Sequence, residues 1–175
     1  MRRGTGRLVV LAVVGLVAGG CGGGGSRTPA PAAVADAAKV DMCTILSNPE
    51  LTQLGIKPET REPENKLGLV GCGWLGDPFT LRLERDKDTI TQYDARRASP
   101  AFTYFADNKV NGRAGIQLSV RSDRSDCAQL MDGGSVSLTV AVAQSGMSYG
   151  TPFDPCGQAL RIAQMIEPRL PKVGT

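Results

Sequence analysis

Five cysteines constrain this chain more than any other feature of its sequence. Cys21 directly follows an apolar run and two glycines, whereas Cys43, Cys72, Cys127 and Cys156 are spread over the remainder. None of these four forms a Cys-x-x-Cys pair, the spacing typical of redox catalysis and of zinc binding. Because an exported protein pairs its cysteines, an odd number leaves one apart, and Cys21 is the natural candidate.

The N-terminus has the pattern of an export signal. Three arginines precede the apolar run Leu8–Ala18, which is shorter than the roughly 20 residues of a membrane-spanning helix. The small residues Ala18-Gly19-Gly20 then resemble a lipobox, in which the following cysteine is acylated and becomes the new N-terminus. The alternative is an ordinary cleaved signal with an incidental cysteine. We expect residues 1–20 to be a signal peptide and Cys21 to anchor the protein at the extracytoplasmic face of the cell membrane.

Residues 22–40 contain mainly Gly, Ser, Pro and Ala, including four consecutive glycines at Gly22–Gly25. This composition is typical of a flexible linker and cannot form a core. We therefore expect a linker over residues 21–40, beginning at the lipidated cysteine, and one folded domain over residues 41–175.

Charge and composition exclude several classes of function. Removing Arg2, Arg3 and Arg7 from the 20 basic residues leaves 17, which equals the 17 acidic residues. The mature domain thus has no basic excess that would attract nucleic acid. The chain has no histidine, which excludes Ser-His-Asp triads and histidine metal sites. We expect no cofactor, no metal ion and no nucleic-acid partner.

Hydrophobic periodicity predicts an α+β domain. Alternation of apolar and polar residues, as in Phe79–Arg85, indicates half-buried strands. The predicted strands are Leu69–Leu75, Phe79–Arg85, Phe102–Val110, Arg113–Arg121, Cys127–Met131 and Ser135–Ala143. The predicted helices are Asp41–Ser47, Asn48–Gly55, Asp88–Ala98 and a C-terminal helix from Asp154 to Leu170, and residues 57–66 are predicted to be a loop. We expect a two-layer fold in which N- and C-terminal helices pack on one face of an antiparallel sheet of about five or six strands.

The C-terminal helix has the clearest signal. Asp154 is a good N-cap and Pro155 suits the first helical position. Apolar residues then recur at helical spacing, and we expect Leu160, Ala163 and Ile166 to be buried against the sheet.

Export favours disulfides between the four remaining cysteines, for which three pairings are possible. We favour Cys43–Cys72 and Cys127–Cys156, because each pair ties the start of a predicted helix to a strand nearby in sequence. Each would close a loop of about 30 residues, worth roughly 3–4 kcal/mol in the chain-entropy model.

Several short patterns recur together across the mature domain. They are Cys43 with Leu46, Gly71-Cys72-x-Trp74, Asn111-Gly112-Arg113-Ala114, Asp126-Cys127, Asp154-Pro155-Cys156 with Ala159, and Leu170-Pro171. In this order, after a lipobox and a Gly-rich linker, they resemble the actinobacterial lipoproteins grouped as domain of unknown function 3558. The resemblance implies an extracytoplasmic lipoprotein with paired cysteines, and it carries over no catalytic residue.

Three charged or Gly-rich segments suggest chemistry that the rest of the chain does not support. Gly146-Met147-Ser148-Tyr149-Gly150 matches the nucleophile elbow Gly-x-Ser-x-Gly, but a helix does not follow directly and no histidine base exists. The segment Arg121–Asp126 could be a calcium loop, but its arginines interrupt the acidic residues, and a solvated connection is favoured. We also expect the charged run Glu84–Asp88 to be solvated surface and a helix cap.

Two residues remain as candidate contacts for a ligand or partner. Trp74 shares a predicted strand face with Cys72, which favours core packing over ligand stacking. Arg113 has no evident local partner, so that it either extends over the sheet surface or binds a carboxylate or a partner protein.

The favoured function is a non-catalytic binding or accessory domain that engages an envelope ligand or a membrane protein. The alternative is a carboxylate-based envelope hydrolase, for which Glu62, Glu64, Asp77 and Asp94 are the candidates. A purely structural role in the envelope is the third possibility.

The anchor leads to the first prediction. Cys21→Ala should move the protein from the membrane fraction to the soluble fraction, because nothing else in the linker or domain sequence resembles a membrane-binding segment. Immunoblots of fractionated cells measure this, with Cys21 intact as the control. Retention of the mutant in membranes that lack any protein partner would contradict the lipid anchor.

Overall fold

The structure of the protein is a computed structural model that describes residues 36–146 and 152–173. Cys21, the predicted signal peptide, most of the predicted linker and Ser148 lie outside the described residues. The described end of the predicted linker already packs with the domain, since Ala37–Lys39 form a 3-10 helix (η1) and Ala37 is buried in the core.

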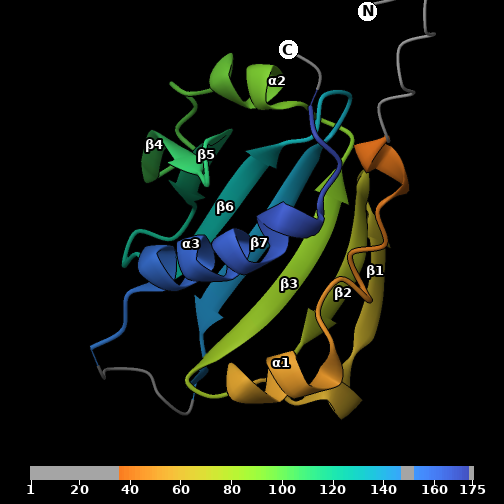
Figure 1. Cartoon of the computed structure of the whole chain (residues 1–175). Helices are drawn as coiled ribbons and strands as arrows, with labels where there is room; N and C mark the ends of the chain where they lie inside the picture. Colours follow the sequence, from red (N-terminus) through yellow and green to blue (C-terminus); the bar gives the residue numbers. More distant parts are fainter. Residues whose placement is uncertain (1–35, 147–151, 174–175) are drawn as a thin grey trace, which may run out of the picture. The chain divides into compact units, whose positions relative to one another are not determined.

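One antiparallel sheet of seven strands is the scaffold of the domain (Figure 1). The strands are β1 (Glu62–Lys66), β2 (Leu69–Trp74), β3 (Phe79–Asp86), β4 (Tyr104–Val110), β5 (Arg113–Ser119), β6 (Asp126–Asp132) and β7 (Ser137–Gln144). In space they follow the order β1-β2-β3-β7-β6-β5-β4. Two meanders, β1 to β3 and β4 to β7, are therefore joined where β3 pairs with β7.

The antiparallel α+β prediction holds, but the expected count of five or six strands is wrong. The additional strand is β1, in the segment for which the sequence predicts a loop. It is an edge strand with mostly exposed charged side chains and a proline, so it lacks the apolar alternation that marks a half-buried strand. Its backbone pairing with β2, from Glu62 opposite Gly73 to Lys66 opposite Leu69, leaves no trace in side-chain periodicity.

The helices are shorter than their patterns predict. They are α1 (Asn48–Gln53), α2 (Ile90–Asp94) and α3 (Pro155–Ile166), with 3-10 helices η2 (Pro58–Thr60) and η4 (Glu167–Arg169). The segment Asp41–Ser47, predicted as a helix, forms turns in which the Asp41 carboxylate accepts hydrogen bonds from the Cys43 N–H and the Thr44 hydroxyl. These local bonds compete with helix formation. The predicted caps of α3 are present, because the Asp154 side chain accepts from the Gly157 N–H and Pro155 follows it.

The main core lies between α3, the α1 segment and one face of the sheet. Leu81 and Leu83 of β3, and Leu138 and Val140 of β7, are fully buried there. From α3, Ala163 and Ile166 are buried as predicted, whereas Leu160 is only half-buried and Ile162, two residues further along the helix, is completely buried. Figure 1 shows α3 crossing β6 and β7.

Both favoured disulfides, Cys43–Cys72 and Cys127–Cys156, are present. Cys72 and Cys127 belong to β2 and β6, and their positions in the ladders place them on the core face with Leu83 and Val142. Each bond therefore fastens an adjoining segment to that face of the sheet.

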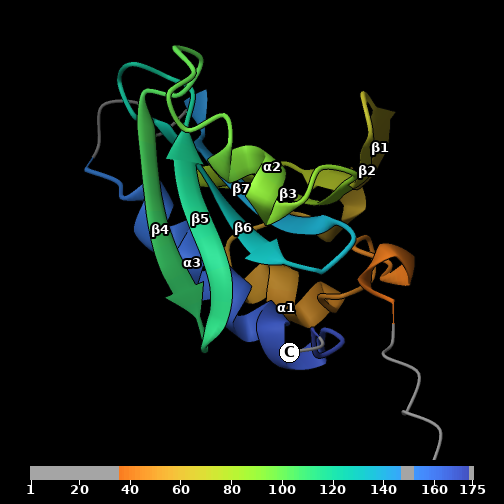
Figure 2. The ribbon, with the colours of Figure 1, turned by 90° about the horizontal axis from the view of Figure 1, so that it is seen from above.

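The other face of the sheet is covered only in part. Short helix α2 packs there over β5 and β6, where Ile116, Leu118 and Leu130 form a second apolar cluster with Tyr93 (Figure 2). We call this second face the open face; along the central strands it carries Glu84 on β3, Thr139 on β7 and Ala128 on β6. No helix of the described residues covers it over β1, β2 and β3.

Packing of α3 leads to the second prediction. Ile166→Ala should lower the free energy of unfolding by about 2–5 kcal/mol, because a fully buried large side chain leaves a cavity. The matched control Gln164→Ala lies on the exposed side of the same helix and should change it by less than about 0.5 kcal/mol. Denaturant melts measure both, and equal small effects would show that α3 is not core.

Candidate functional site

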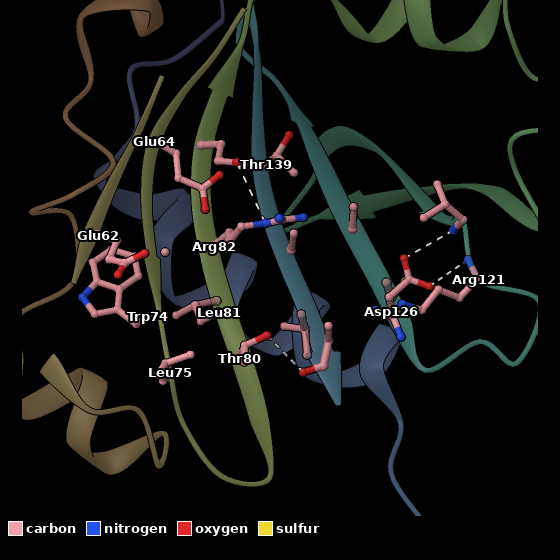
Figure 3. Close-up of a pocket in the computed structure, with 18 of the residues that line it drawn as sticks. Glu62, Glu64, Trp74, Leu75, Thr80, Leu81, Arg82, Arg121, Asp126 and Thr139 are labelled. Atoms are coloured by element: carbon pink, nitrogen blue, oxygen red, sulfur yellow. Dashed lines mark hydrogen bonds and ion pairs between the residues drawn. The ribbon is translucent and has the colours of Figure 1, made fainter. Parts of the chain in front are cut away.

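A pocket of about 590 Å³ opens on the open face of the sheet (Figure 3). Its floor consists of small side chains at alternate positions of β6 and β7, namely Ala128, Ala141 and Ala143. Side chains at alternate positions of a strand share one face, so these small residues lower the floor of the pocket between taller neighbours. The small side chains of β6 and β7 thus create the pocket.

Two rows of residues cross the strands at the β1 end of the pocket. One row places Glu62 opposite Gly73, and Gly73 opposite Arg82 of β3. The next row places Glu64 opposite Gly71, and Gly71 opposite Glu84. Because both intervening residues on β2 are glycines, no side chain separates the β1 carboxylates from the β3 side chains.

Gly71 also permits a very close approach of β2 to β3. A Cβ atom at this position would lie 2.0 Å from the Leu83 carbonyl oxygen and 2.7 Å from the Glu84 Cα atom. A Cβ atom on Gly73 would meet Glu64 Oε1 at 3.0 Å. Gly71 is therefore required for the close pairing of β2 with β3, and Gly73 leaves the space that the Glu64 carboxylate occupies.

Glu84 is the least ordinary residue of the pocket. Its side chain is buried, with the residue only 3% exposed, and its Oε1 atom has no hydrogen-bond partner among the described residues. Arg82 Nε lies 4.0 Å from that oxygen, too far for a hydrogen bond. Burial raises the pKa of Glu84 to about 7; the charge of Arg82 opposes this, while Glu64, by charge and hydrogen bonding, and Asp86 add to it.

Two neighbouring polar atoms share this lack of partners. Thr139 on β7 is the cross-strand neighbour of Glu84, and its hydroxyl is buried without a hydrogen bond to any described residue. The indole N–H of Trp74 also lacks a partner among the described residues, but the Trp74 side chain alternates with Gly73 and lies on the core face with Leu81. A buried polar group without a partner costs about 1–3 kcal/mol, so a concentration of such groups around one pocket calls for an explanation.

The far wall of the pocket is organised by Asp126. Its carboxylate accepts hydrogen bonds from the Ser119 hydroxyl at 2.7 Å and from the backbone N–H groups of Arg121 at 3.0 Å and Val120 at 3.3 Å. Asp126 thereby holds the β5–β6 connection, and Arg121 is exposed. Within the described residues, no group of three or more cysteine or acidic side chains is placed to hold a metal ion.

The two sequence candidates for contacts lie apart from each other. Arg113 is buried on the α3 side, where its guanidinium pairs with Glu167 Oε1 at 3.1 Å and donates to the carbonyl oxygens of Asp132 and Pro171, both at 2.7 Å. It therefore joins the C-terminal segment to the sheet. Trp74 is 4% exposed and packs in the core with Leu81, so that its ring faces are occupied by protein.

Of the four carboxylates considered for hydrolysis, the fold brings only Glu62 and Glu64 into the pocket. Asp94, the last residue of α2, pairs with Arg97 in the turn that follows, and Asp77 lies in the exposed turn before β3. The expectation that the run Glu84–Asp88 is solvated is wrong for its first and third residues, because Glu84 and Asp86 are both buried.

The one sequence signal for the position of Glu84 is the alternation in Phe79–Arg85, which assigns Glu84 to the polar face of its strand. Glu64 of β1, a strand that no pattern predicts, lies across Gly71 from Glu84 on that face, and Tyr93 of α2 bonds to Asp86 at its end. Asp86, buried at the same end, is satisfied by the Tyr93 hydroxyl and by the Asp88 N–H at 3.0 Å, in contrast to Glu84.

Comparison with known proteins yields one match. A family model described as Protein of unknown function (DUF3558) matches residues 16–169. No curated protein and no solved structure matches the chain. Within the described residues, no helix has the length and apolar character needed to cross a membrane.

Burial of Glu84 leads to the third prediction. Its raised pKa means that the folded protein keeps a proton that the unfolded chain loses, so this group's contribution to stability falls as the pH rises from about 4.5 to about 7. Glu84→Gln removes the titration. The unfolding free energy of the variant relative to wild type should therefore rise by about 3 kcal/mol across this window and stay level above it.

Urea melts at a series of pH values measure this difference, in which the titrations of groups that do not interact with Glu84 cancel. Glu59→Gln, at an exposed position of η2, is the matched control. A difference between Glu84→Gln and wild type that does not change with pH would show that Glu84 is ionised normally.

Proposed function

The chain belongs to the family Protein of unknown function (DUF3558), and on that premise we propose that it is a lipid-anchored extracytoplasmic domain that binds a small ligand of the cell envelope in the open-face pocket. The two disulfides indicate an extracytoplasmic location. The predicted signal peptide and lipobox at Cys21 support anchoring at the outer face of the membrane. The predicted linker would let the domain reach ligands near the bilayer surface.

The observation that carries the proposal is the set of buried polar atoms without partners around the pocket. Glu84 Oε1 and the Thr139 hydroxyl both belong to open-face residues that line it. A stable domain gains nothing from leaving such groups unsatisfied, whereas a ligand that bonds to them recovers the cost. Concave sites with a few converging polar groups are the usual form of small-molecule binding sites.

The scaffold supports the same function. The pocket is built on paired strands, and the disulfide at Cys72 fixes the strand that carries Gly71 and Gly73. Sites carried by a rigid sheet hold their geometry without the ligand, which lowers the entropy lost on binding.

Hydrolysis by carboxylates is the second candidate, favoured by one observation. Glu84 can hold the proton that a general acid requires near neutral pH, and Glu62 and Glu64 line the same pocket. A hydrolase turns its ligand over, whereas a binding protein releases it unchanged.

Blocking the pocket leads to the fourth prediction. Ala141→Phe places a large ring on the pocket floor and should exclude the ligand. The amount of the pocket's ligand that mass spectrometry detects in the purified membrane-extracted protein should fall at least about tenfold. Ala114→Phe is the matched control, because it adds the same ring to an exposed position of β5 outside the pocket.

Circular dichroism and thermal melts establish that both variants fold. An identical set of bound small molecules in wild type, Ala141→Phe and Ala114→Phe would overturn the proposal. Recovery of an intact compound from Glu84→Gln together with its cleavage products from wild type would favour the hydrolase.

A further inference from the structure

We infer that the pocket's ligand presents a positively charged nitrogen, an ammonium or a guanidinium group, to the Glu64–Glu84 carboxyl pair, and that it binds in exchange for the proton that the pair holds. This inference rests on the proposed function and specifies the chemical class of its ligand.

The first step is the position of the two orphaned acceptors. Glu84 and Thr139 are 3% and 6% exposed, lie opposite each other on adjacent strands, and both line the pocket. Neither Glu84 Oε1 nor Thr139 Oγ1 has a hydrogen-bond partner among the described residues. An ammonium or guanidinium group carries several N–H donors, so one such group can bond to both oxygens at once.

The second step concerns charge. Glu84 faces Glu64 across Gly71, Asp86 follows on its own strand, and both of these acidic residues disfavour its ionised form. Among the described residues, the cation that opposes them is Arg82, whose side chain is 55% exposed and does not reach hydrogen-bond distance. A buried carboxyl in this situation is neutralised by a proton unless a cation takes the proton's place.

The remaining charged groups near Glu84 do not supply that cation. Its neighbours across the ladder, Gly71 on β2 and Thr139 on β7, carry no charge, and the Tyr93 hydroxyl of α2 is bonded to Asp86. On β1, Glu62 adds a carboxylate to the same face, and Lys66 is exposed at the end of the strand. A cation therefore has to come from outside the described chain.

The alternatives fit less well. An anionic ligand would have to use Arg82 and Arg121, but both are exposed to water and need no partner. A neutral hydroxyl could bond to Glu84 but would not offset the negative charge that the carboxyl pair carries once its proton is lost. A cation both satisfies the buried oxygens and offsets this charge.

The pocket also has an apolar end. Leu75 and Val120 both line it and are 59% and 55% exposed, unusual for residues of their size. With the alanine floor between them, they offer apolar contact to the body of a ligand whose charged nitrogen reaches Glu84.

Three probes of equal chain length and different charge test the inference: pentylammonium, pentanol and pentanoate. Each is titrated into the uniformly labelled wild-type domain, and NMR follows the pocket amides and the Glu84 side-chain carboxyl. Pentylammonium should shift the amides of β3 and β7 that face the pocket and lower the midpoint of Glu84. As the pH rises toward the Glu84 midpoint, the apparent dissociation constant of pentylammonium should fall by up to about tenfold per pH unit. Above the midpoint it should level off.

Glu84→Gln should bind pentylammonium at least about tenfold more weakly and without this pH dependence, because the exchanged proton is gone. Glu64→Gln, which keeps Glu84, should weaken binding and lower the Glu84 midpoint even without a probe. If Glu84→Gln does not fold, the pH dependence in wild type decides alone.

Equal or stronger binding of pentanol or pentanoate in the pocket would overturn the inference, as would a pH-independent response to pentylammonium or no response to it at all. These results are separate from the test of the proposed function. Suppose that Ala141→Phe loses the recovered ligand but the wild-type domain shows no preference for the cation. The proposal of a binding pocket would then stand, and only the inferred class of ligand would be rejected.

Discussion

The disulfides hold both the N-terminal segment and the C-terminal helix to a single face of the sheet. Cys72 and Cys127 lie on that face, and their partners Cys43 and Cys156 belong to the segments that cover it. The main core forms on this side, where Ile162 and Ile166 of α3 are completely buried. Closing two loops of about 30 residues lowers the conformational entropy of the unfolded chain. The resulting stabilisation is a sizeable fraction of a typical domain's free energy of unfolding.

Because α3 packs on the core face, the open face is covered only by shorter elements. Helix α2 covers β5 and β6 with a small apolar cluster, and β1 overhangs the opposite end through the glycines of β2. Between them, the alanines at positions 128, 141 and 143 leave a hollow. The pocket is thus the part of the open face between α2 and β1, and the β1 carboxylates Glu62 and Glu64 line its polar end.

This arrangement leaves a cost in the unliganded domain. Burial, together with the neighbouring Glu64 and Asp86, raises the pKa of Glu84 to about 7, and Thr139 adds a hydroxyl without a hydrogen-bond partner among the described residues. Elsewhere, buried charges are compensated: Arg113 meets Glu167, and Asp86 meets Tyr93. The contrast within one sheet separates the groups that hold the fold together from the groups to which we assign ligand binding, a common division between stability and function.

The sequence by itself determined the elements whose side chains have one covered face. Alternation in Phe79–Arg85, the Asp154-Pro155 cap and the spacing of the cysteines predicted β3, α3 and the disulfides, since these signals are local. Tertiary structure decided the seventh strand and the burial of Glu84. Edge strand β1 is held by backbone hydrogen bonds that any sequence can make, and its carboxylates reach Glu84 only through the register with Gly71. Burial of a polar face depends on which distant segments cover it, and no local pattern records that.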